Sequence, residues 1–288
     1  MDYQRFSAVL NKHIFADERK ELLRSVAERP DRFVGLFRPT KPGTKVLQYL
    51  LQSHEIRFGD AMEELIGEIL TDLGFSPLSK AILGADNRSL SLDQYCQRGG
   101  VYYVIEQKVR DDHDSTKKRG QLSNFESKVE ALTAVHGTRL VGIMYFVDPL
   151  LTKNRGYYQP ELQRLSQFYG VSLHLFYGSE LFDYVDHPEE WERLLDALRR
   201  WKDGLPDLPE INFDTDPEAS FREIHGLGAR SFRRLMENDE LWADGIMHTL
   251  FRQGTTLRML LDFFRSRSEP YYQQLAESLA ARLERHYS

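Results

Sequence analysis

The chain has 288 residues and a globular composition, because 41% of them are hydrophobic and 12% are aromatic. At roughly 100–200 residues per domain, this length predicts one large domain or two ordinary ones. The formal net charge of −6 excludes a polybasic protein that binds nucleic acid or membranes by charge alone. A local basic cleft remains compatible with it.

The cysteine content and the apolar runs point to a cellular location. The single cysteine, Cys96, excludes intrachain disulfides, zinc fingers and iron–sulfur clusters. Residues 1–20 carry charges where a signal peptide needs an apolar core. The longest apolar stretch, 140–147, is far shorter than the roughly 20 residues of a membrane helix. We therefore expect a soluble cytoplasmic protein with no membrane association.

Helices and a hairpin are predicted in the first part of the chain. Residues 1–53 predict a helical segment that is interrupted between Pro39 and Gly43. The apolar residues of 55–73 fall on one helix face, and Gly74 is typical of the residue that ends a helix. Two strands follow at 89–96 and 101–109, and the Gly99-Gly100 pair between them indicates a tight hairpin.

The middle of the chain alternates helices and strands. We expect helices near 116–135, 159–168 and 189–200, and strands at 139–147 and 171–177. The continuous apolar run 139–147 is typical of a central strand that is covered on both faces. This order predicts an α/β fold with a mixed sheet flanked by helices.

The last third of the chain predicts a separate helical part. Glycine and prolines punctuate an acidic stretch at 201–217, which favours a linker there. We expect a helical N-terminal segment (1–53), an α/β domain (54–203) and a helical C-terminal domain (218–288).

Three charged side chains meet on the predicted hairpin. If Gly99-Gly100 is a two-residue loop, counting back from the pair Arg98 and Val101 places Asp93 opposite Glu106. Side chains alternate along a strand, so Lys108 shares their face. Two carboxylates this close favour a bound cation, and their oxygens suit Mg²⁺. A salt-bridged sheet surface is the alternative, although the strand 101–109 is too apolar for a freely solvated ribbon.

This arrangement resembles the PD-(D/E)xK nuclease superfamily and its type II restriction endonucleases. The residues that carry the resemblance are Asp93, the Glu106-Gln107-Lys108 motif within IEQKVRDDHDSTKKRGQ (105–121), and RFGDAMEEL (57–65). It covers about residues 54–178. No proline precedes Asp93, so Asp86 is an alternative first acidic residue.

The resemblance implies a magnesium-dependent endonuclease that cuts double-stranded DNA at specific sites and leaves 5′-phosphates. Asp93, Glu106 and the main-chain carbonyl of Gln107 would bind the metal ion. Lys108 would orient the attacking water or stabilise charge on the phosphate. The resemblance also implies a homodimer and a cognate DNA methyltransferase as a functional partner.

Two more residues are candidates for this site. Glu63 lies at the edge of the apolar face of helix 55–73, where it could add a metal ligand. A partly buried glutamate bound to Arg57 or to a tyrosine fits the pattern equally well. Gln121 could face the active site, as in the resembling endonucleases, or could simply face solvent.

Two segments of the α/β domain are candidate DNA contacts. The helix near 116–135 has cations in its first turn, Lys117, Lys118 and Arg119, which oppose the helix dipole unless phosphates approach. The loop 148–161 contains residue types that read bases in the major groove. Its candidates are Lys153, Asn154, Arg155 and Tyr157. An ordinary surface loop is the alternative.

Residues 221–236 resemble a helix-hairpin-helix motif, whose glycine-rich turn offers main-chain N–H groups to a phosphate. The candidate phosphate contacts are Gly226, Gly228, Arg230 and Arg233. A packed helical bundle with a glycine-capped turn is the alternative.

Two other functions remain compatible with the sequence. A repair or recombination nuclease of the same superfamily would recognise DNA structure and not sequence. A non-catalytic DNA-binding regulator would bind DNA without a metal ion and cut nothing.

Overall fold

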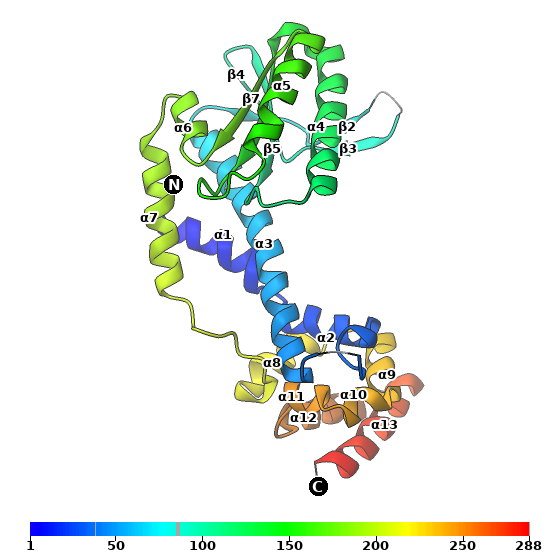
Figure 1. The fold of residues 1–288 in the computed structure, drawn as a ribbon. Helices are drawn as coiled ribbons and strands as arrows, with labels where there is room; N and C mark the ends of the chain where they lie inside the picture. The colour runs from blue at the N-terminus through cyan, green and yellow to red at the C-terminus, as the bar shows by residue number, and fades with distance from the viewer. Residues whose placement is uncertain (38, 85–86, 288) are drawn as a thin grey trace. The chain divides into compact units, whose positions relative to one another are not determined.

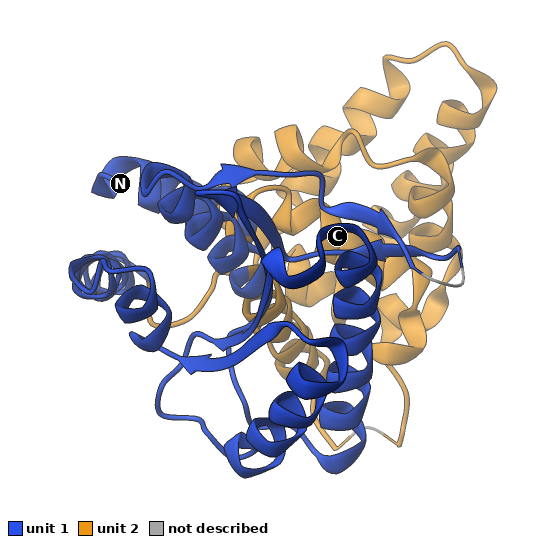
Figure 2. Ribbon diagram, turned by 90° about the horizontal axis from the view of Figure 1, so that it is seen from above, with its two compact units in different colours: residues 1–13, 58–205 blue, residues 14–57, 206–288 orange. Residues whose placement is uncertain are grey.

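The structure is a computed structural model that forms two compact units (Figure 2). The residues it describes are 1–37, 39–84 and 87–287. Unit 1 consists of residues 1–13 and 58–205, and unit 2 of residues 14–57 and 206–288. The predicted segment 1–53 therefore contributes residues to both units. None of the helices formed by the described residues could span a membrane.

The described part of residues 1–72 forms three α-helices. They are α1 (Tyr3–Phe15), α2 (Glu18–Glu28) and α3 (Pro42–Asp72), with a 3₁₀ turn, η1, at Pro30–Arg32. The predicted helix 55–73 is the second half of α3, which continues without a break from Pro42. Proline favours the first turn of a helix, because its fixed φ suits that position. Gly74, with φ +86°, follows the helix in the left-handed conformation predicted for it.

A five-stranded mixed sheet, in the order β1-β4-β5-β6-β7, forms the centre of unit 1. Its strands are β1 (Ser76–Pro77), β4 (Gln94–Arg98), β5 (Val101–Lys108), β6 (Leu140–Phe146) and β7 (Ser172–Tyr177). β1, β4 and β5 pair antiparallel, whereas β5, β6 and β7 are parallel. The mixed α/β fold predicted from the sequence is confirmed.

The predicted single strand 89–96 is wrong. The structure divides it into β3 (Ser89–Ser91) and β4, and β3 pairs with β2 (Ala81–Leu83) in a separate two-stranded sheet. Between them, Leu92 is 1% exposed and its amide donates to the carbonyl of Lys80 at 2.8 Å. The chain therefore anchors Leu92 just before Asp93, and β4 begins only at Gln94.

Helices cover both faces of the sheet. On one face lie α4 (Ser115–His136) and α5 (Arg155–Tyr169), whose buried side chains form a core with those of the strands (Figure 1). All seven residues of β6 are buried, as predicted for a central strand. Toward the other face, Gln94 Nε2 donates to the main-chain carbonyl of Glu63 in α3 at 2.5 Å. Two further helices, α6 (Glu180–Tyr184) and α7 (Glu189–Asp203), follow β7, and a 3₁₀ turn, η2, at Gly137–Arg139 precedes β6.

Helix α5 begins at Arg155, four residues earlier than predicted. Tyr158, Leu162 and Leu165 are all buried at helical spacing, so the tyrosine ring extends the apolar face by one turn toward the N-terminus. The predicted loop 148–161 therefore ends at Asn154, and its remaining residues belong to the helix.

Unit 2 is helical and has its own apolar core, which confirms the helical C-terminal region. Its C-terminal helices are α8 (Pro217–Ile224), α9 (Ala229–Glu237), α10 (Asp239–Ala243), α11 (Ile246–Leu250), α12 (Thr255–Arg265) and α13 (Pro270–His286), preceded by the 3₁₀ turn η3 (Phe213–Thr215). Residues of α2, such as Leu22 and Val26, join this core together with Phe232 and Trp242.

A glycine in the central strand tests this packing. A Cβ added to Gly142 would lie 2.6 Å from Leu173 Cδ2 and 3.1 Å from Phe125 Cζ. We expect Gly142→Ala to lower the free energy of unfolding by about 1–3 kcal/mol, because overpacking a filled core forces side chains out of their rotamers. Urea unfolding followed by circular dichroism measures this loss.

The matched control is Gly120→Ala in α4, where an added Cβ meets no described atom within 4 Å. This substitution should leave stability unchanged or raise it by up to about 1 kcal/mol, because alanine favours the helix. Equal stability of the two variants would contradict the close approach at Gly142.

Candidate active site

The hairpin between β4 and β5 sets the geometry of the site. Gly99 and Gly100 both have positive φ, at 59° and 81°, which is the conformation of a two-residue type I′ turn. Arg98 pairs with Val101, as predicted. The same register pairs Gln94 with Ile105, which places Asp93 beside the end of β5.

Three oxygen atoms gather around the ammonium of Lys108. Asp93 Oδ2 accepts hydrogen bonds from Lys108 Nζ at 2.9 Å and from the main-chain N–H of Gln107 at 2.8 Å. Lys108 Nζ also donates to the main-chain carbonyl of Gln107 at 2.7 Å and lies 3.0 Å from Glu106 Oε1. The structure therefore brings Asp93, Glu106 and Lys108 together on one face.

The oxygens around Lys108 fit a divalent metal ion. Two carboxylates and a main-chain carbonyl converge on one positive charge, and hard oxygen atoms are the ligands that Mg²⁺ and Ca²⁺ prefer. Among the described residues, no three His, Cys, Asp or Glu side chains gather closely enough to hold a metal ion by themselves. A bound ion would thus take its other ligands from water and phosphate.

The charge state of Lys108 follows from its neighbours. Burial by itself would lower the pKa of Lys108. The charges of Glu106 and Asp93, and the hydrogen bonds to both carboxylates, outweigh that effect, so the pKa is raised above its ordinary value. Lys108 is therefore protonated at neutral pH.

A second lysine, Lys128 of α4, was missed by the sequence analysis. It is 3% exposed, and its Nζ lies 2.5 Å from Oε2 of Glu106, which is itself 4% exposed. The sequence contains a signal for it, because Lys128 falls three residues after Phe125 and four before Leu132 on the buried face of the helix. A lysine at such a position needs a buried partner of opposite charge.

Glu63 and Gln121 each have a direct partner outside the group of Asp93, Glu106 and Lys108. The carboxylate of Glu63 pairs with Lys80 Nζ at 2.6 Å. Burial raises the pKa of Glu63, and Lys80 opposes this shift. The charges of Asp93 and Lys108 also act on the Glu63 carboxylate, so Glu63 lies near the candidate site. Gln121 Oε1 accepts the hydroxyl hydrogen of Tyr158 at 2.7 Å, which ties α4 to α5. The alternative acidic residue, Asp86, lies outside the described residues.

Cations stand at the beginning of α4. The carboxylate of Asp114 caps the helix by accepting hydrogen bonds from the main-chain N–H groups of Thr116 and Lys117 at 2.9 Å. Lys117 and Arg119 are exposed, and Lys118 Nζ lies 4.5 Å from the centre of the Tyr157 ring. These cations are available to a ligand at the surface of unit 1.

Asn154 is buried instead of reaching solvent. It is 4% exposed, and it donates its main-chain N–H and its side-chain amide to Asp111 at 2.8 and 2.7 Å. The amide also donates to the carbonyl of His113 at 3.1 Å. Both side-chain amide hydrogens are therefore engaged, and this placement argues against the base contact predicted for Asn154.

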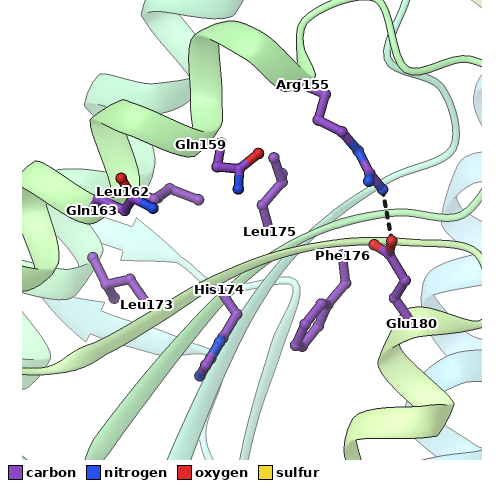
Figure 3. Close-up of a pocket in the computed structure, with 9 residues that line it drawn as sticks. All are labelled: Arg155, Gln159, Leu162, Gln163, Leu173, His174, Leu175, Phe176 and Glu180. Atoms are coloured by element: carbon purple, nitrogen blue, oxygen red, sulfur yellow. Dashed lines mark hydrogen bonds and ion pairs between the residues drawn. The ribbon is translucent and has the colours of Figure 1, made fainter.

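A hollow beside β7 displays Arg155 and two glutamines of α5 (Figure 3). Arg155 pairs with Glu180 at 2.8 Å, and its guanidinium carbon lies 4.4 Å from the centre of the Tyr177 ring. Gln159 and Gln163 line the same hollow of about 370 Å³, and neither was among the predicted site residues. Lys153 lies just before this helix and donates to the carbonyl of Asp112 at 3.2 Å.

In unit 2, the predicted glycine-rich turn connects α8 and α9. Gly226 and Gly228 are exposed, whereas Leu227 between them is buried. Arg230 and Arg233 of α9 are also exposed. The turn therefore presents glycine backbone and arginines together, which is compatible with a phosphate contact.

Residues 84–202 match the family model of HinfI, a type II restriction endonuclease. This match supports a type II restriction endonuclease. The matched residues include Asp93, Glu106 and Lys108, and the family places the chain in the PD-(D/E)xK superfamily, as the sequence predicted. No curated protein matches the chain. The match supports a site-specific deoxyribonuclease, and it favours neither the structure-specific nuclease nor the non-catalytic regulator.

The buried carboxylate of Asp111 provides a test of the loop beside the site. It is fully buried and accepts hydrogen bonds from both donors of Asn154 and from the hydroxyl of Tyr177 at 2.8 Å. We expect Asp111→Ala to destabilise the protein by at least about 2 kcal/mol, because each buried donor left unsatisfied costs about 1–3 kcal/mol. Asp112→Ala, in which the neighbouring carboxylate is 49% exposed, should cost far less. Denaturant unfolding of both variants measures the difference, and equal losses would contradict this role of Asp111.

Proposed function

We propose that Asp93, Glu106 and Lys108 of this restriction endonuclease hydrolyse DNA with Mg²⁺ and leave 5′-phosphates. The observation that supports this most is the position of the Lys108 ammonium, on which oxygens of Asp93, Glu106 and Gln107 converge at 2.7–3.0 Å. These three oxygens are the proposed metal ligands. Glu63 and Gln121 are bound to Lys80 and Tyr158 in the structure, so the proposal does not include them.

Asp93, Glu106 and Lys108 would have different roles in the hydrolysis. A Mg²⁺ ion at these oxygens supplies an activated water molecule and neutralises charge on the scissile phosphate. Asp93 and Glu106 provide the negative charge that attracts the ion. Because the pKa of Lys108 is raised, Lys108 is suited to orient the attacking water and to stabilise negative charge, and it is poorly suited to remove a proton.

DNA contacts are proposed for two parts of unit 1. Lys117, Lys118 and Arg119, at the beginning of α4, would contact phosphates, and Lys153 and Tyr157 would support them. Arg155 would read a base from the hollow beside β7, and Gln159 is a second candidate there. Arginine and glutamine side chains pair bidentately with guanine and adenine. Asn154 is left out because it is buried.

In unit 2, the turn between α8 and α9 would bind phosphates. Gly226 and Gly228 offer main-chain N–H groups, and Arg230 and Arg233 offer positive charge. Main-chain N–H groups and arginines grouped at one turn are suited to phosphate oxygens, and phosphate contacts carry no sequence information, so we assign this turn to affinity and not to specificity.

Cleavage of both DNA strands favours a dimeric enzyme, and cleavage of DNA in a living cell requires protection of the host genome. A two-fold homodimer would place one active site on each strand of a palindromic sequence. A cognate DNA methyltransferase would protect the host genome from the enzyme. We place the enzyme in the cytoplasm, where incoming unmodified DNA is exposed to it.

Removing the side chain of Glu106 or of Lys108 should reduce DNA cleavage and leave DNA binding intact. We expect Glu106→Ala and Lys108→Ala each to slow cleavage by at least about 10²-fold, because both groups act on the phosphate and its metal ion. DNA binding without divalent metal should survive, because neither residue contacts a base edge. Plasmid cleavage in Mg²⁺ and gel-shift titration measure the two effects.

The controls for these variants are Glu130→Ala and Lys202→Ala, which remove exposed side chains of the same types. Both controls should cut at the wild-type rate. Undiminished cleavage by Glu106→Ala or Lys108→Ala would refute the proposed active site.

The two proposed DNA-binding regions should respond differently to substitution. Arg155→Ala should cost about 1–3 kcal/mol on the cognate site and relax the preference at one base pair. Arg230→Ala and Arg233→Ala should weaken cognate and non-cognate binding alike. Each should reduce the slope of log affinity against log salt by roughly one unit.

Binding isotherms on matched and single-mismatch duplexes, recorded at several salt concentrations, test this division. A change of site preference in Arg230→Ala, together with a uniform loss of affinity in Arg155→Ala, would reverse the assignment. Unit 2 would then be the part that reads the sequence.

A further inference from the structure

The two carboxylate oxygens of Glu106 have different partners. Oε1 lies 3.0 Å from Lys108 Nζ, within the group of proposed metal ligands. Oε2 lies 2.5 Å from Lys128 Nζ. The side chain of Lys108 is 36% exposed, whereas that of Lys128 is 4% exposed, so one oxygen faces the accessible site and the other faces the core.

The pair on the core side is difficult to open. Lys128 is held on the buried face of α4 beside Phe125, Val129 and Leu132, where an ammonium group without a countercharge would be costly. Breaking a buried ion pair by withdrawing one partner strongly destabilises a protein. Oε2 of Glu106 is therefore committed to Lys128 and is not free to bind a second cation.

The number of carboxylate oxygens that Glu106 can offer affects the binding of Ca²⁺ and of Mg²⁺ differently. Ca²⁺ accepts six to eight oxygens and often binds both oxygens of one carboxylate, whereas Mg²⁺ requires octahedral geometry with close ligands and keeps several waters. A carboxylate that can offer only one oxygen therefore lowers the affinity for Ca²⁺ more than the affinity for Mg²⁺.

We propose that Lys128 is a positioning residue that restricts Glu106 to single-oxygen coordination and so makes the site select Mg²⁺ over Ca²⁺. This inference rests on the metal site proposed above. Lys128 touches neither DNA nor the metal ion in this account, and it acts only through Glu106.

Metal titration of the 288-residue chain tests the proposal without using cleavage. Isothermal titration calorimetry with MgCl₂ and with CaCl₂ gives the ratio of the two affinities for the wild type, Lys128→Met and Lys128→Gln. Partners of metal ligands typically change metal affinity by roughly 10–100-fold, so we expect Lys128→Met to raise the preference for Ca²⁺ over Mg²⁺ by at least about tenfold. Lys128→Gln keeps a hydrogen-bond donor and should show a smaller increase.

The control is Lys12→Met, which removes the lysine of an exposed Lys–Glu pair, with Glu64, in the same unit. It should leave the ratio unchanged. If Lys128 serves packing alone, both affinities will change by the same factor in the folded Met or Gln variant, and the proposal is overturned. Failure of the wild type to bind either ion would refute the metal site itself, and this inference with it.

Discussion

Two carboxylates on one face of a hairpin need positive charge between them, and unit 1 supplies it from both sides. Lys108 lies between Asp93 and Glu106 on the accessible side, and Lys128 holds Glu106 from the core. The fold maintains this concentration of charge because the hairpin register, the burial of β5 and the packing of α4 fix all four side chains. The same charge explains why the group suits a divalent cation, which would take over the neutralisation that the Lys108 ammonium provides.

The register of the hairpin depends on two glycines in its turn, which are not themselves part of the proposed active site. Gly99 and Gly100 adopt positive φ and set the pairing of β4 with β5, so they determine which residues stand beside Asp93. A shift of one residue would move Glu106 and Lys108 to the opposite face of the sheet. The close approach at Gly142 brings Phe125 of α4 against β6, and α4 also carries Lys128. Local backbone conformation and close packing thus position the site together.

Much of this arrangement could be predicted from the sequence, because it depends on short-range rules. The glycine pair and strand alternation place Asp93, Glu106 and Lys108 on one face without any knowledge of the fold.

Lys128 was missed because its partner lies 22 residues away, and a lysine within an apolar helix face does not reveal which carboxylate it meets. Asn154 was assigned to a DNA-reading loop because nothing near it in the chain shows that it is buried against Asp111. The strand 89–96 was predicted without a break because the hydrogen bond from Leu92 to Lys80 comes from a separate segment.

The central claim is that one divalent ion binds between Asp93 and the end of β5. Replacing Mg²⁺ with Fe²⁺ and adding ascorbate and peroxide generates radicals that cut the polypeptide next to the bound ion, and mass spectrometry of the fragments locates the cuts. Our account predicts cuts near Asp93 and near residues 106–108, suppressed by excess Mg²⁺ and absent in Glu106→Ala. Cuts that cluster elsewhere, or that persist in Glu106→Ala, would contradict it.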